Sequence, residues 1–249
     1  MGSASKTSAL YSQLSQLSPQ ARKVLKTALE RELTEHERRN KIAAYYPEEG
    51  PLRRELYEKH MAFFAAGNEH RERLMLAANR VGKTEGVGGY EVVLHLTGEY
   101  PDWWPGRRFD KPTSGWAAGD TSLTVRDIIQ HKLLGPPGEY GTGLIPGDRL
   151  KGTTARAGVP NAVQDIMVHH VSGGTSYLTL KSYDQRRESF QGTEKDFIWL
   201  DEEPPMDVYG ECLIRTMTTQ GLILCTFTPL QGMSEVVQSF LPGGKLPDE

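Results

Sequence analysis

The 249-residue chain contains little cysteine, no long hydrophobic run and no strong net charge. Its two cysteines, Cys212 and Cys225, lack the spacing of metal ligands, which is typical of a protein from a reduced compartment. Because no apolar stretch approaches the roughly 20 residues that span a bilayer, we expect no membrane association. The first residues also lack the apolar core of a signal peptide, so the sequence favours a cytoplasmic location.

The formal net charge of −3 gives no global electrostatic argument for binding nucleic acid. Basic residues are paired locally, but most such pairs in proteins belong to solvated faces. With 37% hydrophobic and 24% charged residues, a chain of this length can bury one substantial core. We therefore expect one principal domain.

Residues 77–84, AANRVGKT, are close to the phosphate-binding pattern G-x-x-x-x-G-K-[ST] but begin with alanine. In this pattern consecutive backbone N–H groups point at phosphate oxygens, Lys83 supplies a positive charge and Thr84 offers a hydroxyl to Mg²⁺. An apolar run at residues 73–77 predicts a preceding strand, and residues 83–96 predict a following helix that Gly98 ends. The alternative is an ordinary turn between a strand and a helix. The predicted nucleotide-binding residues are Ala77, Ala78, Asn79, Arg80, Val81, Gly82, Lys83 and Thr84.

A second motif, FIWLDEEPP, begins at Phe197. Its continuous apolar run predicts a strand covered on both faces of a parallel sheet, and ligands of such sheets bind at the carboxyl ends of the strands. Asp201 could hold the metal through its water shell, while Glu202 could orient or deprotonate an attacking water. The alternative is the polar rim of a sheet.

A third buried-type strand is predicted at residues 221–229, where it ends in hydroxyl residues. If this strand lies beside the Asp201 strand, Thr226 and Thr228 would approach the γ-phosphate and could transmit its presence to neighbouring elements. A strand followed by a polar turn is the alternative.

The rest of the chain predicts a helical region before this core. We expect a disordered tail at residues 1–17, a helical lead-in at residues 18–67 and a P-loop core at residues 68–240. In the lead-in, Ser18 begins one helix, Thr34 and Glu37 resemble a capping box for a second, and residues 52–66 form a third.

Within the core, we expect a strand at residues 114–118, a helix from Thr121 or Ser122 to Leu134, and a long loop at residues 135–158. A Gly-Gly turn between residues 166–171 and 176–180 predicts an antiparallel hairpin at the edge of the sheet. The irregular stretch at residues 101–112, PDWWPGRRFDKP, could contact DNA, or could be a packed loop with two tryptophans. Its candidate DNA-contacting residues are Arg107, Arg108 and Lys111.

The three motifs, in this order, resemble the ATPase portion of the large terminase subunit of tailed double-stranded DNA phages, from about Tyr57 to about Phe240. The resemblance implies an α/β, RecA-like P-loop fold of the additional-strand, catalytic-glutamate class, with a mainly parallel sheet flanked by helices. It also implies Mg²⁺-dependent ATP hydrolysis that drives double-stranded DNA into the procapsid. The implied setting is the cytoplasm of the infected bacterial host, with the portal protein and the small terminase subunit as partners. A homo-oligomeric ring would form on the procapsid, with a monomer in solution.

The resemblance also assigns individual residues. Tyr57 and His60 occupy the family's adenine-contacting segment, where His60 replaces a glutamine; an ordinary helix-face histidine is the alternative. Charge on a transferring phosphoryl group needs a cationic stabiliser, and Arg80, Arg186 and Arg187 compete for this role. Arg187 best matches the family's arginine that acts on a neighbouring subunit, whereas Arg80 could act within its own subunit.

Full-length members of this family also carry a nuclease domain resembling RNase H. Because this chain ends at Glu249, we expect ATP hydrolysis without DNA cleavage, and a linker that begins at residues 241–249. Two other functions share parts of the pattern. One is a helicase or another nucleic-acid translocase, which usually carries a second motor lobe, and the other is a nucleotide-binding assembly subunit that does not hydrolyse ATP.

Overall fold

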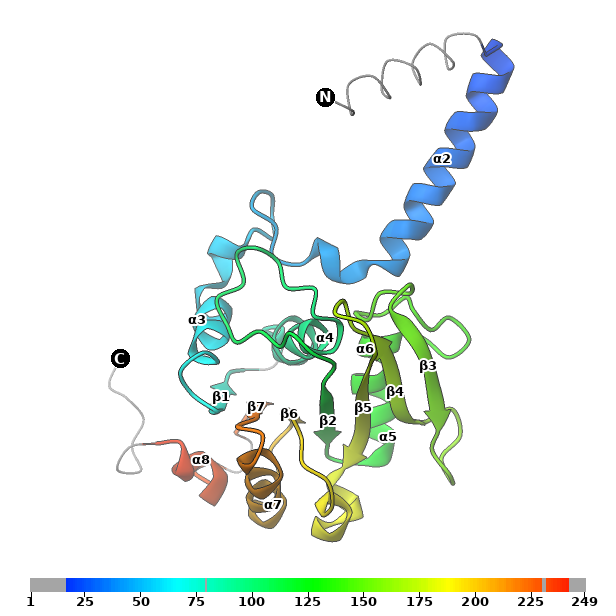
Figure 1. Ribbon diagram of the computed structural model, residues 1–249. Coiled ribbons are helices and arrows are strands. Elements are labelled where there is room, and N and C mark those ends of the chain that lie inside the picture. The colour runs from blue at the N-terminus through cyan, green and yellow to red at the C-terminus, as the bar shows by residue number, and fades with distance from the viewer. Residues whose placement is uncertain (1–16, 79, 230–231, 242–249) are drawn as a thin grey trace. The chain divides into compact units, whose positions relative to one another are not determined.

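The computed structural model describes residues 17–78, 80–229 and 232–241, which separate into two units, Met1–Arg39 and Asn40–Glu249 (Figure 1). The first unit is described by helix α2 (Pro19–Arg39), and the second contains the sheet. Nearly all of the expected tail and linker, and Asn79 of the phosphate loop, lie outside the described residues. Within the described residues, none of the helices combines the length and apolar character needed to cross a bilayer.

The predicted second helix at Thr34 is wrong, because α2 continues through this residue to Arg39. The Thr34 hydroxyl donates to the carbonyl oxygen of Glu30 at 2.8 Å, four residues earlier in the same helix. A side chain that bonds to the preceding turn cannot cap a new helix. A short 3₁₀ turn (Lys41–Ala44) follows, and a second 3₁₀ turn (Arg54–Tyr57) leads into α3 (Glu58–Ala66).

The second unit contains a seven-stranded sheet with the order β1-β7-β6-β2-β5-β4-β3. Strands β1, β7, β6, β2 and β5 are parallel neighbours, whereas β4 and β3 add antiparallel pairs at one edge. The α/β class with a mainly parallel sheet is therefore confirmed, and β7 is the additional strand between β1 and β6. The strands are β1 (Glu72–Leu76), β2 (Ser114–Gly119), β3 (Leu150–Ala155), β4 (Val163–His169), β5 (Thr175–Ser182), β6 (Phe197–Asp201) and β7 (Leu222–Phe227).

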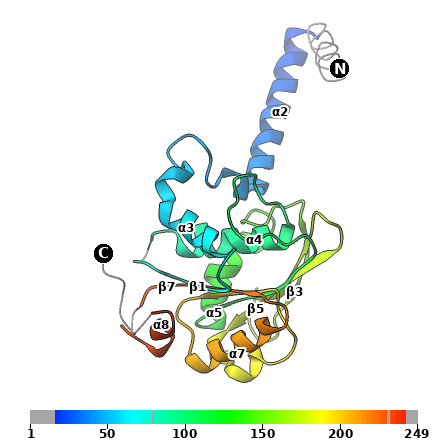
Figure 2. The ribbon, with the colours of Figure 1, turned by 60° about the vertical axis from the view of Figure 1, so that its left-hand side comes forward.

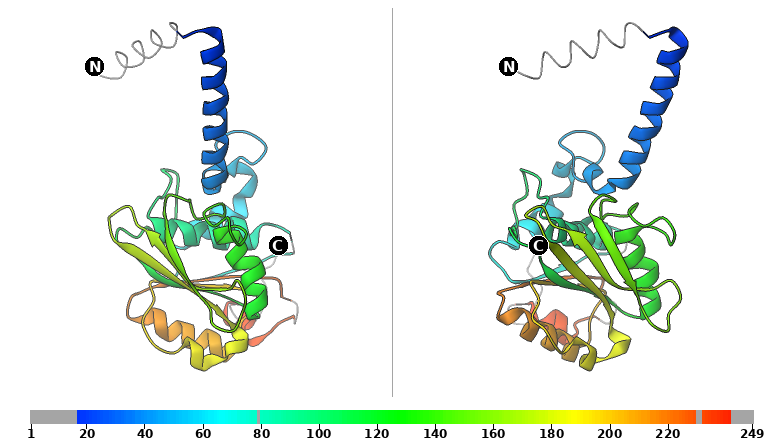
Figure 3. Two further views of the ribbon diagram at one scale, coloured as in Figure 1. Left: turned by 90° about the vertical axis from the view of Figure 1, so that its right-hand side faces the viewer. Right: turned by 45° about the vertical axis from the view of Figure 1, so that its right-hand side comes forward.

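The antiparallel edge contains one more strand than the sequence predicts (Figure 3). The expected hairpin is β4 and β5, and Gly173 and Gly174 supply the positive φ angles of 90° and 83° in its turn. The expected loop at residues 135–158 instead includes β3, which pairs with β4 through an irregular register. Its sequence, LKGTTA, is partly exposed and has no apolar alternation, so only the pairing with β4 identifies it as a strand.

Alternating side chains along β6 build two separate cores. Phe197 and Trp199 face one core with α3 and α4 (Tyr90–Thr97), whereas Ile198 and Leu200 face the other with α7 (Met206–Met217) and α8 (Glu235–Ser239). Helices α4 and α7 therefore lie on opposite sides of the sheet (Figure 2). This double coverage explains why β6 is apolar without alternation.

The predicted helix after the phosphate loop is present in two parts. A π-helical segment (Lys83–Gly89) leads directly into α4, and Gly98 ends α4 with a positive φ of 73°. The predicted cap at Thr121 is also present, and a helical stretch follows through α5 (Ser122–Thr124), a π-helical segment (Val125–Gln130) and α6 (His131–Leu134).

A buried ionic network connects β1 to α4. The Glu91 carboxylate is fully buried and accepts hydrogen bonds from both terminal nitrogens of Arg73, at 2.7 and 3.1 Å. His95 Nε2 lies 3.1 Å from the same carboxylate. Burial would raise the pKa of Glu91, but Arg73 and His95 lower it overall. Glu91 is therefore charged, and Arg73 and His95 stabilise this charge in the interior.

Candidate active site

The carboxyl ends of β1, β6 and β7 bring the three sequence motifs together. In the parallel register, Asp201 of β6 lies opposite Thr226 of β7, and Leu76 at the end of β1 lies opposite Phe227. The phosphate loop follows β1 directly, so Lys83 and Thr84 begin the helical segment beside these strand ends. Residues separated by more than 100 positions therefore share one site.

The Lys83 ammonium group lies inside this site. Its Nζ donates to the carbonyl oxygens of Ala77 and Ala78 at 2.8 and 2.7 Å, and to Thr228 Oγ1 at 2.9 Å. Burial lowers the pKa of Lys83, while the nearby carboxylates of Glu202 and Asp201 oppose this shift. Thr228 Oγ1 also donates to Ala77 O at 2.9 Å, so the end of β7 is attached directly to the phosphate loop.

Asp201 provides a buried carboxylate between two hydroxyl groups. Thr226 Oγ1 donates to its Oδ1 at 2.8 Å, and Thr84 Oγ1 lies 3.1 Å from both of its oxygens. Burial is the main reason that the pKa of Asp201 rises to about 7, although the two hydroxyl groups oppose the shift. A carboxylate and a hydroxyl are ligands that suit Mg²⁺, and a cation here would offset the cost of burying the charge. The residues present therefore fit a magnesium ion.

Two of the three predicted catalytic residues have a positive φ angle, as do Tyr46, Asn161, Arg186 and Gln220. Arg80 and Glu202 have positive φ angles of 67° and 66°, which are unusual for residues other than glycine. The Tyr183 hydroxyl lies 3.0 Å from the Glu202 carbonyl oxygen and 3.2 Å from that of Asp201, and thus supports this turn. The Glu202 side chain is exposed at the end of β6. Such strain is characteristic of functional sites, where surrounding contacts hold an unfavourable conformation.

A cavity of about 600 Å³ lies beside the phosphate loop, and Tyr57 and His60 both line it together with Arg80, Val81 and Gly82. His60 Nδ1 lies 2.8 Å from the Tyr46 hydroxyl, which also lies 2.6 Å from the Gly86 carbonyl oxygen. Burial lowers the pKa of His60, which favours the neutral ring. The structure thus places the residues of the expected adenine-contacting segment next to the loop.

Glu85 attaches the segment before α3 to the helix that follows the phosphate loop. Its carboxylate accepts hydrogen bonds from Tyr45 at 2.7 Å, from Lys132 at 2.5 Å and from Lys41. Burial alone would raise the pKa of Glu85, but these three hydrogen bonds lower it to about 2. The sequence analysis missed Lys41, Tyr46 and Glu85 because their partners are about 40 positions away, which no local pattern can show.

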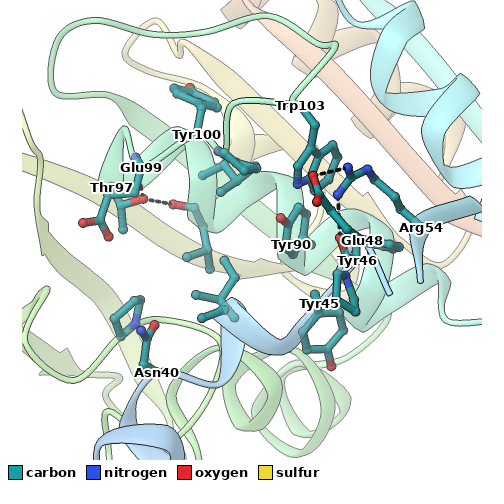
Figure 4. Close-up of a pocket in the computed structure, with 17 residues that line it drawn as sticks. Asn40, Tyr45, Tyr46, Glu48, Arg54, Tyr90, Thr97, Glu99, Tyr100 and Trp103 are labelled. Atoms are coloured by element: carbon teal, nitrogen blue, oxygen red, sulfur yellow. Dashed lines mark hydrogen bonds and ion pairs between the residues drawn. The ribbon is translucent and has the colours of Figure 1, made fainter. Parts of the chain in front are cut away.

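A second cavity, of about 520 Å³, is also lined by Tyr45 and Tyr46 (Figure 4). Five aromatic and three proline residues are among the 17 that line it, and the Arg54 guanidinium lies 5.2 Å from the Trp103 ring centroid. Its described lining contains no residue of the three motifs. The motif residues therefore lie at the first cavity and the adjacent strand ends, not at this second cavity.

Three arginines that the sequence analysis proposed for catalysis or DNA contact, Arg187, Arg107 and Arg108, make contacts within the chain. Arg187 Nε donates to Glu211 Oε2 of α7 at 3.2 Å. Arg107 donates to the Gln220 carbonyl and Arg108 to the Pro101 carbonyl, and their guanidinium groups lie over Phe109 and Tyr100 respectively. The loop that carries the candidate DNA contacts is thus a packed loop in this structure, while Lys111 is exposed.

Comparison with protein families decides the affiliation. The sequence model of the N-terminal part of the T4-like-virus-type terminase large subunit matches residues 74–245, which include all three motifs. The chain belongs to this terminase family. The terminase large subunit of Salmonella phage P22 is 37% identical over 205 residues, covering 74% of this chain and 41% of that protein. This terminase chain therefore spans about two fifths of the length of that relative.

Solved structures agree on the fold of the terminase chain. The large terminase ATPase domain of Thermus phage P74-26 superposes with a TM-score of 0.50 at 20% identity, covering 70% of this chain and 65% of that one. The RecA-like P-loop fold implied by the family resemblance is thereby confirmed, and its mainly parallel sheet has seven strands.

Proposed function

We propose that this terminase chain hydrolyses ATP with Mg²⁺ and that hydrolysis drives double-stranded DNA into a procapsid. The observation that carries the proposal is the convergence of Lys83, Thr84 and Asp201 at the strand ends, with Glu202 directly following Asp201. A site that only binds nucleotide needs no carboxylate beside the metal-binding residue. The strained backbone of Glu202 is further support, because strain is retained where function requires a fixed direction.

Each residue has a distinct part in this chemistry. The N–H groups of residues 77–84 and the Lys83 ammonium would bind the phosphates, with Tyr57 and His60 beside the base. Thr84 and Asp201 would hold Mg²⁺, which would neutralise phosphate charge when bound. Glu202 would accept the proton of the attacking water.

The Lys83 contacts also support coupling of nucleotide to motion. All three protons of its ammonium group have acceptors within the protein, and one of these is Thr228 at the end of β7. A phosphate group that attracts Lys83 competes with the Thr228 hydroxyl for the same protons. Binding and release of phosphate would therefore alter the contact between Thr228 and the phosphate loop, with Thr226 of the same strand adjoining Asp201.

The first test is hydrolysis itself. The purified chain should release phosphate from ATP in the presence of Mg²⁺, and a chelator should abolish the release. Lys83→Ala should raise the dissociation constant of a fluorescent ATP analogue at least about tenfold, because a charge-assisted contact to phosphate is lost. Lys111→Ala, an exposed lysine outside this site, is the matched control and should leave binding unchanged. Equal affinities for both variants would refute the assigned phosphate site.

The second test concerns the arginine that we propose to act on a neighbouring subunit. Arg187 must leave Glu211 to reach another nucleotide, whereas the adjacent Arg186 has the strained backbone angles φ 59° and ψ 172°. We expect Arg187→Ala to reduce ATPase activity of the assembled ring by about 10³-fold or more, and that of the monomer far less. Measurements with Arg186→Ala provide the matched comparison.

Mixed rings distinguish action within a subunit from action between subunits. A subunit with Arg187→Ala keeps its own Glu202, and a subunit with Glu202→Gln keeps its own Arg187. If Arg187 acts between subunits, mixing these two inactive variants should restore measurable phosphate release at the junctions. If the mixture stays as inactive as its components, Arg187 does not act in this way.

The partners remain part of the proposal. Double-stranded DNA, the portal protein and the small terminase subunit would act on the chain in a homo-oligomeric ring in the host cytoplasm. Stimulation of phosphate release by DNA or by portal would support a packaging motor over another translocase. Arg107, Arg108 and Lys111 remain candidates for DNA contact, although the two arginines would first have to release their present carbonyl partners.

A further inference from the structure

A tryptophan on the Asp201 strand is connected to the metal-binding carboxylate through one hydroxyl group. Trp199 is fully buried, and its Nε1 donates to Thr226 Oγ1 at 2.8 Å. Thr226 Oγ1 in turn donates to Asp201 Oδ1 at 2.8 Å. Trp199 and Asp201 are two residues apart on β6 and therefore point to the same face of the sheet. Thr226 lies opposite Asp201 on β7.

The direction of this hydrogen-bond chain is determined by its donors. An indole N–H can only donate, and a threonine hydroxyl has a single proton. Because Trp199 occupies a lone pair of the Thr226 oxygen, the hydroxyl proton is directed to the carboxylate. The same carboxylate also accepts from Thr84. Trp199 thus limits the rotation of the one hydroxyl that contacts Asp201 from β7.

Packing against Gly88 also holds the N–H edge of the indole in place. A Cβ atom added to Gly88 would lie 2.2 Å from Trp199 Nε1, which is far closer than any real contact. The indole is therefore wedged between the helical segment that begins with Lys83 and Thr84 and the end of β7. Trp199 thus belongs to β6, the strand of Asp201, and packs against the helical segment after the phosphate loop. It also hydrogen-bonds to Thr226 of β7.

We propose that Trp199 is a positioning residue that orients the Asp201 carboxylate for Mg²⁺ through the Thr226 hydroxyl. The proposal rests on the nucleotide and metal site proposed above, and Trp199 would act through Thr226 and not as a ligand of either. Outer groups that orient a metal ligand typically change metal affinity by about 10- to 100-fold when they are removed. Removal of the indole N–H should therefore weaken the contribution of Mg²⁺ and spare the binding of nucleotide alone.

The test compares nucleotide affinity with Mg²⁺ and with a chelator, using a fluorescent ATP analogue. For Trp199→Phe we expect the Mg²⁺ concentration at half-maximal effect to rise about tenfold, with unchanged affinity in the chelator. Trp104→Phe is the matched control, because Trp104 is also buried and its Nε1 donates to a carbonyl, that of Arg107. This control should leave the Mg²⁺ dependence unchanged. An equal Mg²⁺ dependence in wild type and Trp199→Phe would overturn the proposal.

Two further variants separate the hydrogen bond from packing. Benzothienylalanine at position 199 keeps the ring shape but removes the N–H, and it decides the question if Trp199→Phe does not fold. Thr226→Val removes the intermediate hydroxyl, and in this background Trp199→Phe should produce no further rise in the Mg²⁺ requirement. Additive effects would refute action through Thr226. If wild type shows no Mg²⁺ effect on binding and no turnover, the proposed function fails, independently of Trp199.

Discussion

Glu202→Gln should reduce ATP turnover by about 10²- to 10⁴-fold, the range that positioned proton-transfer groups contribute. Glutamine has the size of glutamate but cannot accept the proton of the attacking water. The residues proposed to bind phosphate and metal, Lys83, Thr84 and Asp201, should remain in place because Glu202 makes no side-chain contact with them among the described hydrogen bonds. The measurement is phosphate release at saturating ATP and Mg²⁺, with affinity for a fluorescent ATP analogue determined separately.

Glu203→Gln is the matched control for this experiment. It removes an adjacent carboxylate from the same turn at the end of β6 and should leave turnover within about twofold of wild type, since an exchange outside the reacting groups costs little. Retained binding with lost turnover in Glu202→Gln alone would support catalysis by this side chain. Unchanged turnover in that variant would refute the assigned base, and a lower affinity would assign Glu202 to binding instead.

Glu91→Ala should lower the free energy of unfolding by about 3–5 kcal/mol, the typical cost of breaking a buried ion pair. The Glu91 carboxylate is fully buried and is the shared acceptor for Arg73 and His95. Its removal leaves the Arg73 guanidinium buried without its carboxylate, although the hydrogen bond from Arg73 to the Phe63 carbonyl remains. Because this network connects β1 to α4, the variant should also disturb the position of the phosphate loop between them. Urea unfolding with linear extrapolation measures the change.

Glu48→Ala is the control, because it removes an exposed ion pair instead of a buried one. Glu48 pairs with Arg54 at 3.0 Å, but its side chain is 82% exposed. Exposed pairs contribute about 0–1 kcal/mol, so this variant should unfold close to the wild-type midpoint. Equal losses of stability in the two variants would contradict the importance of burial, and a small loss in Glu91→Ala would show that Arg73 finds another partner or water.

Local patterns in the sequence were sufficient for the strands and turns of the site. The continuous apolar runs before Asp201 and Thr226 predicted β6 and β7, because strands that are covered on both faces have no polar side to display. The same reasoning failed for β3, whose exposed edge position needs no apolar pattern. It also failed at Thr34, where a capping sequence lies inside a continuous helix. The local sequence of a capping box can therefore occur both at a helix start and inside a continuous helix.

The sequence by itself determined the loop motif at residues 77–84, the acidic strand end at Asp201 and the resemblance to the terminase family that the comparisons confirmed. These features depend on neighbouring residues and on backbone N–H groups, so a short stretch of chain contains all the necessary information. Only the tertiary structure decided that Trp199 hydrogen-bonds to Thr226, which in turn hydrogen-bonds to Asp201. It also decided that Glu85 pairs with Lys41 and Lys132 beside the phosphate loop. Trp199 and Thr226 are 27 positions apart, and their contact requires β7 to lie beside β6 in one particular register. Strand order and register arise from the packing of the whole sheet, which no local segment specifies.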